Sequence, residues 1–253
     1  MDIAVITGAS SGMGREFVLA LDKESRLDEI WVVARREDRL LQLQGSCRAK
    51  VVPLVLDLAD NASVEVYDDM LSQRHPHIKV LVNAAGFGLF GTFSELSMAE
   101  QLDCINVNDR SLTAFTYASL PYMDKGSQIY NLGSLSSFQP TPYMSVYSAS
   151  KAFVLSFSRA MNVELRSRGI RVMAVCPGWI KTEFFDRAVS DDTINYFNRY
   201  YTAKEVIDQA LADMKKGKDV SVLGLPEKLQ VWLVKHLPHR LVMRTWCKQQ
   251  GIK

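Results

Sequence analysis

Residues 3–21 read IAVITGASSGMGREFVLAL, and this stretch decides the fold of the chain. Ile3–Thr7 is an apolar, β-branched run typical of a buried strand, and residues 15–21 have helical periodicity. The glycines between them let the backbone approach a phosphate, and the helix start offers free N–H groups, so the stretch favours dinucleotide binding. A mere tight turn is the alternative, since the spacing TGxxxGxG differs from the common GxGxxG. The expected cofactor contacts here are Gly8, Ser10, Ser11, Gly12, Met13 and Gly14.

Strands and helices alternate along the rest of the chain. Further apolar runs, typical of strands, occupy residues 30–34, 51–56, 79–82, 127–133, 170–175 and 219–223. This pattern predicts an α/β fold, a doubly wound parallel sheet of about seven strands in three layers, with residues 1–225 as a single domain. Residues 226–253 form an amphipathic helical tail that packs on this domain, forms a subunit interface or lies on a membrane surface.

Composition excludes several classes of function. The 253 residues carry a net charge of only +2, which predicts no nucleic-acid partner. The four cysteines form no CxxC pair, so we expect neither a metal site nor a disulfide framework. This cysteine usage suggests a reducing compartment. The chain enters a strand directly after Met1-Asp2, which leaves no room for a signal peptide, and no apolar run reaches the length of a membrane span. A cytoplasmic protein is the resulting expectation.

The end of the second strand predicts which cofactor is bound. An acid there binds the ribose of NAD, whereas arginine accommodates the 2′-phosphate of NADP. Ala34 is followed by Arg35 and Arg36, so the sequence favours NADP(H) over NAD(H). A solvated charge cluster with Glu37 and Asp38 is the alternative interpretation.

Tyr147 and Lys151 are the candidate proton-transfer pair. Four residues apart on a helix, they lie on one face, and a nearby ammonium lowers the pKa of a phenol. Ser134 follows the predicted strand 127–133 and is expected at its carboxyl end, where open α/β sheets bind ligands. A surface Tyr-Lys pair is the alternative. Asn106 and Asn108 are poor helix formers within a predicted helix, so each either distorts it through a polar contact or faces solvent.

Taken together, these residues resemble the short-chain dehydrogenase/reductase family over residues 1–223. The resemblance rests on the segments 7–14, 83–86 and 147–151, on Asp57, Asn106 and Ser134, and on Pro177-Gly178 with Thr182. It departs from the family at Ala84, where a second asparagine is more usual. The resemblance implies catalytic roles for Asn106, Ser134, Tyr147 and Lys151, with Asn106 anchoring a water that connects Lys151 to solvent. The cofactor contacts that it adds are Asp57, Leu58, Asn83, Ala84, Ala85, Gly86, Tyr147, Lys151, Pro177, Gly178, Ile180 and Thr182.

The implied function is an NADP(H)-dependent oxidoreductase that reduces a ketone or aldehyde, or runs the reverse reaction. The aromatic segment 184–201 suggests an apolar substrate, although core packing explains the same rings. The resemblance also implies a homodimer or homotetramer. A non-catalytic NADP-binding sensor on the same fold is the alternative.

Overall fold

The protein is built around a seven-stranded parallel sheet in the order β3-β2-β1-β4-β5-β6-β9. The computed structural model describes residues 1–180 and 199–252. The strands are β1 (Asp2–Thr7), β2 (Glu29–Ala34), β3 (Lys50–Val55), β4 (His77–Asn83), β5 (Gln128–Leu132), β6 (Arg171–Val175) and β9 (Val220–Ser221). The predicted doubly wound α/β fold is confirmed.

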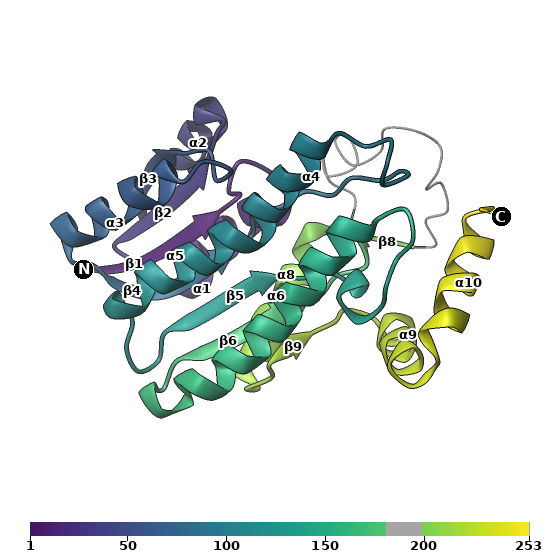
Figure 1. Ribbon diagram of the computed structural model, residues 1–253. Coiled ribbons are helices and arrows are strands. Elements are labelled where there is room, and N and C mark those ends of the chain that lie inside the picture. Colours follow the sequence, from purple (N-terminus) through teal and green to yellow (C-terminus); the bar gives the residue numbers. More distant parts are fainter. Residues whose placement is uncertain (181–198, 253) are drawn as a thin grey trace.

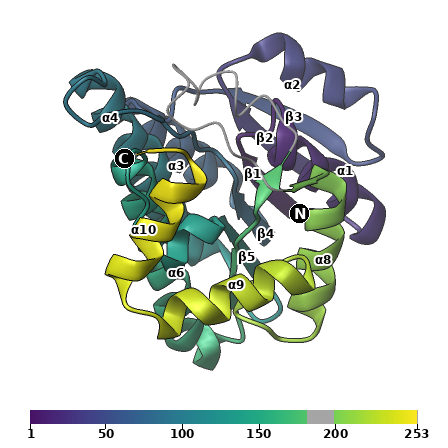
Figure 2. The same cartoon turned by 90° about the vertical axis from the view of Figure 1, so that its right-hand side faces the viewer.

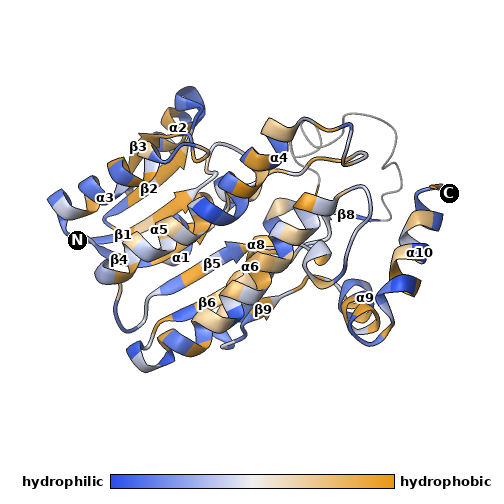
Figure 3. Cartoon of the chain, viewed as in Figure 1, coloured by the Kyte–Doolittle hydropathy of each residue, from blue (hydrophilic) through white to orange (hydrophobic). Residues whose placement is uncertain are grey.

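Helices cover both faces of the sheet (Figure 1). On one face lie α1 (Gly12–Glu24), α2 (Glu37–Gln44) and α8 (Ala203–Lys215), and on the other α3 (Ala62–Arg74), α5 (Ser111–Ser119) and α6 (Ser145–Glu164). Successive residues of β1 alternate between the two layers, because side chains of a strand point to opposite faces. Both faces are buried, so most residues within β1 and β2 are hydrophobic, as Figure 3 shows for β1.

The strand order reverses between β1 and β4, and ligands of such sheets bind at this point. The conformation of the turn after β1 leaves room for a ligand at this point. Gly8 has a φ of +68°, in the left-handed region, and a Cβ on Gly14 would lie 2.2 Å from the Gly8 carbonyl oxygen. The start of α1 therefore packs directly on the turn, with its N-terminus at the switch point.

A π-helix interrupts the helical stretch that follows β4. This stretch consists of α4 (Met98–Ile105), the π-helix η1 (Asn106–Arg110), α5 and the 3₁₀ turn η2 (Leu120–Tyr122). The sequence predicts a distortion at its asparagines, and η1 is that distortion. Such π segments are frequent at functional sites, and this one lies beside α6.

The C-terminal part adds two short strands and two helices beyond the sheet. β7 (Trp179–Ile180) pairs with β8 (Tyr200–Tyr201), while the 3₁₀ segments η3 (Leu135–Phe138) and η4 (Leu165–Arg168) flank α6. The helices α9 (Leu225–His236) and α10 (His239–Gln249) form the predicted helical tail, and α9 runs across the end of the molecule between α6 and α8 (Figure 2). Within the described ranges, no helix has both the length and the apolar character needed to cross a bilayer.

Candidate active site

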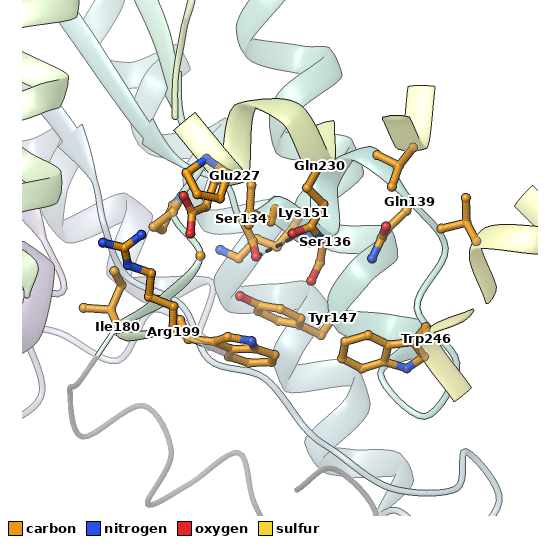
Figure 4. Close-up of a pocket in the computed structure, with 18 of the residues that line it drawn as sticks. Ser134, Ser136, Gln139, Tyr147, Lys151, Ile180, Arg199, Glu227, Gln230 and Trp246 are labelled. Carbon is orange, nitrogen blue, oxygen red and sulfur yellow. Dashed lines mark hydrogen bonds between the residues drawn. The ribbon is translucent and has the colours of Figure 1, made fainter. Parts of the chain in front are cut away.

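Ser134, Tyr147 and Lys151 lie together at the carboxyl edge of the sheet (Figure 4). Ser134 follows β5 by two residues and caps η3, and its hydroxyl accepts a hydrogen bond from the Ser136 backbone N–H at 3.1 Å. Tyr147 and Lys151 come from the first turns of α6 and are both buried. The sequence therefore predicts this grouping correctly, and the surface-pair alternative is excluded.

Burial controls the charge of both members of the pair. It raises the pKa of Tyr147 to about 12, although a hydrogen bond with Ser134 acts in the opposite direction. Burial also lowers the pKa of Lys151, whose Nζ donates to the Leu132 carbonyl at 2.8 Å and lies 5.8 Å from the Tyr147 ring centre. The expectation that Lys151 lowers the pKa of Tyr147 is thus wrong for the chain by itself, because desolvation of the phenolate dominates. At neutral pH Tyr147 is a protonated phenol, the form that donates a proton.

The asparagine of this site is Asn108, which corrects the prediction of Asn106. Asn108 is 1 % exposed, its Nδ2 donates to Ser150 Oγ at 2.9 Å, and its Oδ1 accepts from the Phe87 N–H at 3.1 Å. A Cβ on Gly86 would lie 3.0 Å from Asn108 Oδ1 and 3.2 Å from Lys151 Nζ, so both side chains border the same small volume. Asn106 is only half-buried, because residues two apart on a helix point in different directions.

We expect Asn108→Ala to lower both stability and turnover. Its amide joins η1 to the catalytic helix through Ser150, and losing a buried hydrogen-bonding group costs about 1–3 kcal/mol. Urea unfolding and the rate of NADPH oxidation measure the two effects. Asn106→Ala is the matched control, expected to change the free energy of unfolding by less than about 0.5 kcal/mol. An equal loss in both variants would contradict the assignment of Asn108.

The glycine-rich turn forms one wall of a cavity of about 340 Å³. Arg36 reaches across it: its Nη2 donates to Ser10 Oγ at 3.0 Å and to Ser11 Oγ at 2.9 Å. Arg35 lies 3.8 Å from the Asp57 carboxylate. The predicted residues that line this cavity are Gly8, Ser10, Ser11, Gly12, Met13, Gly14, Arg35, Arg36, Asp57, Leu58, Ala84, Ala85 and Gly86. A guanidinium next to two hydroxyls on a glycine-rich turn suits a phosphate, so these residues fit the adenosine half of a dinucleotide.

Two of the predicted contacts have structural roles that the sequence left open. Asn83 joins the strands, because its Nδ2 donates to Asn131 Oδ1 at 2.8 Å. The Asp57 carboxylate accepts from the Ala59 N–H at 3.0 Å and so stabilises its own turn. It does not cap α3, whose first N–H, on Ala62, is bound by Asp60.

A larger cavity, of about 540 Å³, surrounds Tyr147 and shares Met13, Ala84 and Gly86 of its lining with the cavity at the glycine-rich turn. Pro177, Gly178 and Ile180 line it, as predicted, while Thr182 and most of the aromatic segment lie outside the described residues. The helices α9 and α10 also contribute to the wall of this cavity, which sequence reasoning did not anticipate. Trp246 of α10 stands beside Tyr147 in Figure 4, and its Nε1 donates to the Pro142 carbonyl at 3.0 Å.

Known proteins are similar to this chain in sequence and in fold. Sulfoacetaldehyde reductase 2 of Chromohalobacter salexigens is 36% identical over 205 residues, which is 75% of this chain and 79% of that protein. A short-chain dehydrogenase from Sphingobium yanoikuyae, solved in complex with NADPH, has a TM-score of 0.79 and 28% identity, with 98% of this chain and 94% of that one covered. A Burkholderia phymatum enzyme solved with NAD shares the fold, with a TM-score of 0.80 at 19% identity over 96% of this chain and 95% of that one. The short chain dehydrogenase family model matches residues 2–193, and the chain therefore belongs to this family of oxidoreductases.

Proposed function

We propose that the protein is an NADP(H)-dependent oxidoreductase that reduces a ketone or aldehyde with an apolar substituent to the alcohol. One observation carries the proposal: the cavity with Arg36 and the cavity with Tyr147 are neighbours that share Met13, Ala84 and Gly86 in their walls. A dinucleotide with its 2′-phosphate at Arg36 can therefore extend past Gly86 to the residues around Tyr147. NADPH is also the ligand of the Sphingobium relative.

The residues of the larger cavity have complementary roles in carbonyl reduction. When bound, the nicotinamide supplies the hydride. The Ser134 hydroxyl donates a hydrogen bond to the carbonyl oxygen and orients it, and Tyr147 donates its proton to the oxygen as negative charge develops there. Lys151, fixed by the Leu132 carbonyl, places its amino group near this proton transfer, and Asn108 positions the helix that carries both residues.

The protonation state of Tyr147 suits the role of proton donor. A pKa of about 12 keeps the phenol neutral at physiological pH, so the acid needed for reduction is present without activation.

A panel of ketones and aldehydes of increasing alkyl length tests the proposal, with NADPH oxidation followed by absorbance. Leucines of α9 and α10 line the cavity, so we expect kcat/KM to rise with chain length, by up to about fourfold per methylene. NADPH binding without turnover of any member would favour the sensor alternative. Preference for the shortest polar aldehydes would contradict the apolar substrate class.

A further inference from the structure

The helical tail exposes apolar side chains that the fold does not use. Along α9, Leu225 is 81 % exposed, and Leu229 and Trp232 are each 57 % exposed. Their spacing of four and three residues places them on one stripe. The face that holds α9 to the body is a different one, made by Val231 and Val234.

This stripe continues into the rim of the large cavity. Leu229, Leu233, Leu237 and Leu241, which we call the rim leucines, all line that cavity and all remain exposed. Leu229 and Leu233 belong to α9, Leu237 lies in the turn after it, and Leu241 belongs to α10, so both helices contribute to this lining. The tail thus exposes apolar side chains both on the outer stripe and in the lining of the cavity that holds Tyr147.

Basic residues flank these apolar side chains. The helices α9 and α10 contain five lysines and arginines and one acid, a net +4, whereas the whole chain carries +2, so the remainder carries −2. The single acid, Glu227, is buried and accepts a hydrogen bond from the Tyr201 hydroxyl at 2.7 Å, so its charge is directed inward. Arg240, Arg244 and Lys248 form an exposed row along α10, next to Leu241.

We propose that α9 and α10 dock on an anionic lipid bilayer. The outer stripe and rim leucines enter the boundary between headgroups and acyl chains, and the row of Arg240, Arg244 and Lys248 contacts anionic headgroups. An indole at the edge of an apolar patch suits this boundary, and Trp232 is held there by its ring contact with His236 at 4.8 Å. The docked geometry lets an apolar ligand pass between the bilayer and the cavity along the rim leucines. The docking itself does not depend on the proposed reaction.

Vesicle co-sedimentation of the full chain tests the docking. Vesicles of phosphatidylcholine alone are compared with vesicles that also contain about 30% phosphatidylglycerol, at low and high salt. We expect pelleting with the anionic vesicles that weakens at high salt. Absence of pelleting with either vesicle would overturn the proposal.

Matched variants show whether the tail is the docking surface. Leu225→Gln with Trp232→Gln changes two residues outside the cavity lining and is expected to weaken partitioning at least about tenfold. Replacing Arg240, Arg244 and Lys248 by Gln is expected to weaken it by about two orders of magnitude, and only on anionic vesicles. Leu41→Gln with Val66→Gln is the control, since these residues of α2 and α3 are 44 % and 47 % exposed and lie away from the tail.

Light scattering distinguishes two explanations for the exposed stripe: contact with a bilayer and contact with a second copy of the chain. We expect the Leu225/Trp232 variant to keep the molar mass of the parent. A smaller mass would make the stripe an interface between copies and overturn the proposal. Equal partitioning of the tail variants and the control into vesicles would also overturn the proposal.

Discussion

Tyr147→Phe is expected to bind NADPH as the parent does and to lose about 10²–10⁴-fold in kcat for carbonyl reduction. The substitution removes one hydroxyl at a buried position and leaves the ring, so the packing of α6 is retained. Stopped-flow measurement of NADPH oxidation gives the rate, and quenching of protein fluorescence gives cofactor affinity. Because the pKa of Tyr147 is raised to about 12, the parent keeps its acid protonated between pH 6 and 9, and Tyr147 imposes no fall in the reductive rate over that range.

Tyr67→Phe is the matched control for this variant. Tyr67 is fully buried, and its hydroxyl pairs with Ser119 Oγ at 2.7 Å, away from both cavities. Its loss is expected to cost about 1 kcal/mol of stability with turnover unchanged. Comparable turnover by the Tyr147→Phe variant and the parent would refute Tyr147 as the proton donor.

Arg36→Ala is expected to lower the affinity for NADPH by about 10- to 100-fold and that for NADH by less than about threefold. The guanidinium lies against the Ser10 and Ser11 hydroxyls, where a 2′-phosphate would accept its hydrogen bonds, whereas NADH has no charge at that position. Titration of the two cofactors by fluorescence measures both constants in one variant. Arg35→Ala is expected to have the smaller effect, because Arg35 faces the Asp57 carboxylate.

Arg36→Lys tests whether charge alone is sufficient. A lysine keeps the charge but loses the planar set of donors that reaches two hydroxyls, so an intermediate NADPH affinity is expected. Equal losses for NADPH and NADH in Arg36→Ala would mean that Arg36 only holds the glycine-rich turn in place, and the cofactor preference would have to be abandoned.

The fold could be predicted from the sequence because its determinants are local. Each strand is an apolar run, each helix has its own period, and Gly8 and Gly14 occupy positions where a side chain would collide or strain the backbone. Tyr147, Lys151 and Ser134 were also readable, since one helical turn and one strand end suffice to place them.

Asn108 was missed although the sequence holds a signal for it. Cys104, Asn108, Leu112 and Phe115 are spaced as one helical stripe, and all four are buried. Asn106 instead follows the exposed Leu102 and Ile105. A periodicity applied across the whole helix would have selected the correct asparagine. The π-helix at that point shifts the register of its residues and weakens the pattern.

The placement of the tail and the pKa of Tyr147 could not be predicted from local sequence patterns. Which face of α9 meets the cavity depends on where the chain crosses the sheet edge, and no local pattern encodes that placement. The pKa of Tyr147 depends on how completely distant segments exclude water from the phenol, so spacing to Lys151 alone gave the wrong direction.

The cavity around Tyr147 is lined by two separate parts of the polypeptide, to which we assign different roles. Ser134, Tyr147 and Lys151, to which we assign the proposed proton transfer, come from the first 180 residues, whereas another part of the wall comes from α9 and α10. Under the proposed function, we expect substitutions in α9 and α10 to change substrate preference more than the rate of the chemical step. A chimera that carries another family member's C-terminal helices on this body would inherit that donor's ligand preference at an unchanged intrinsic rate.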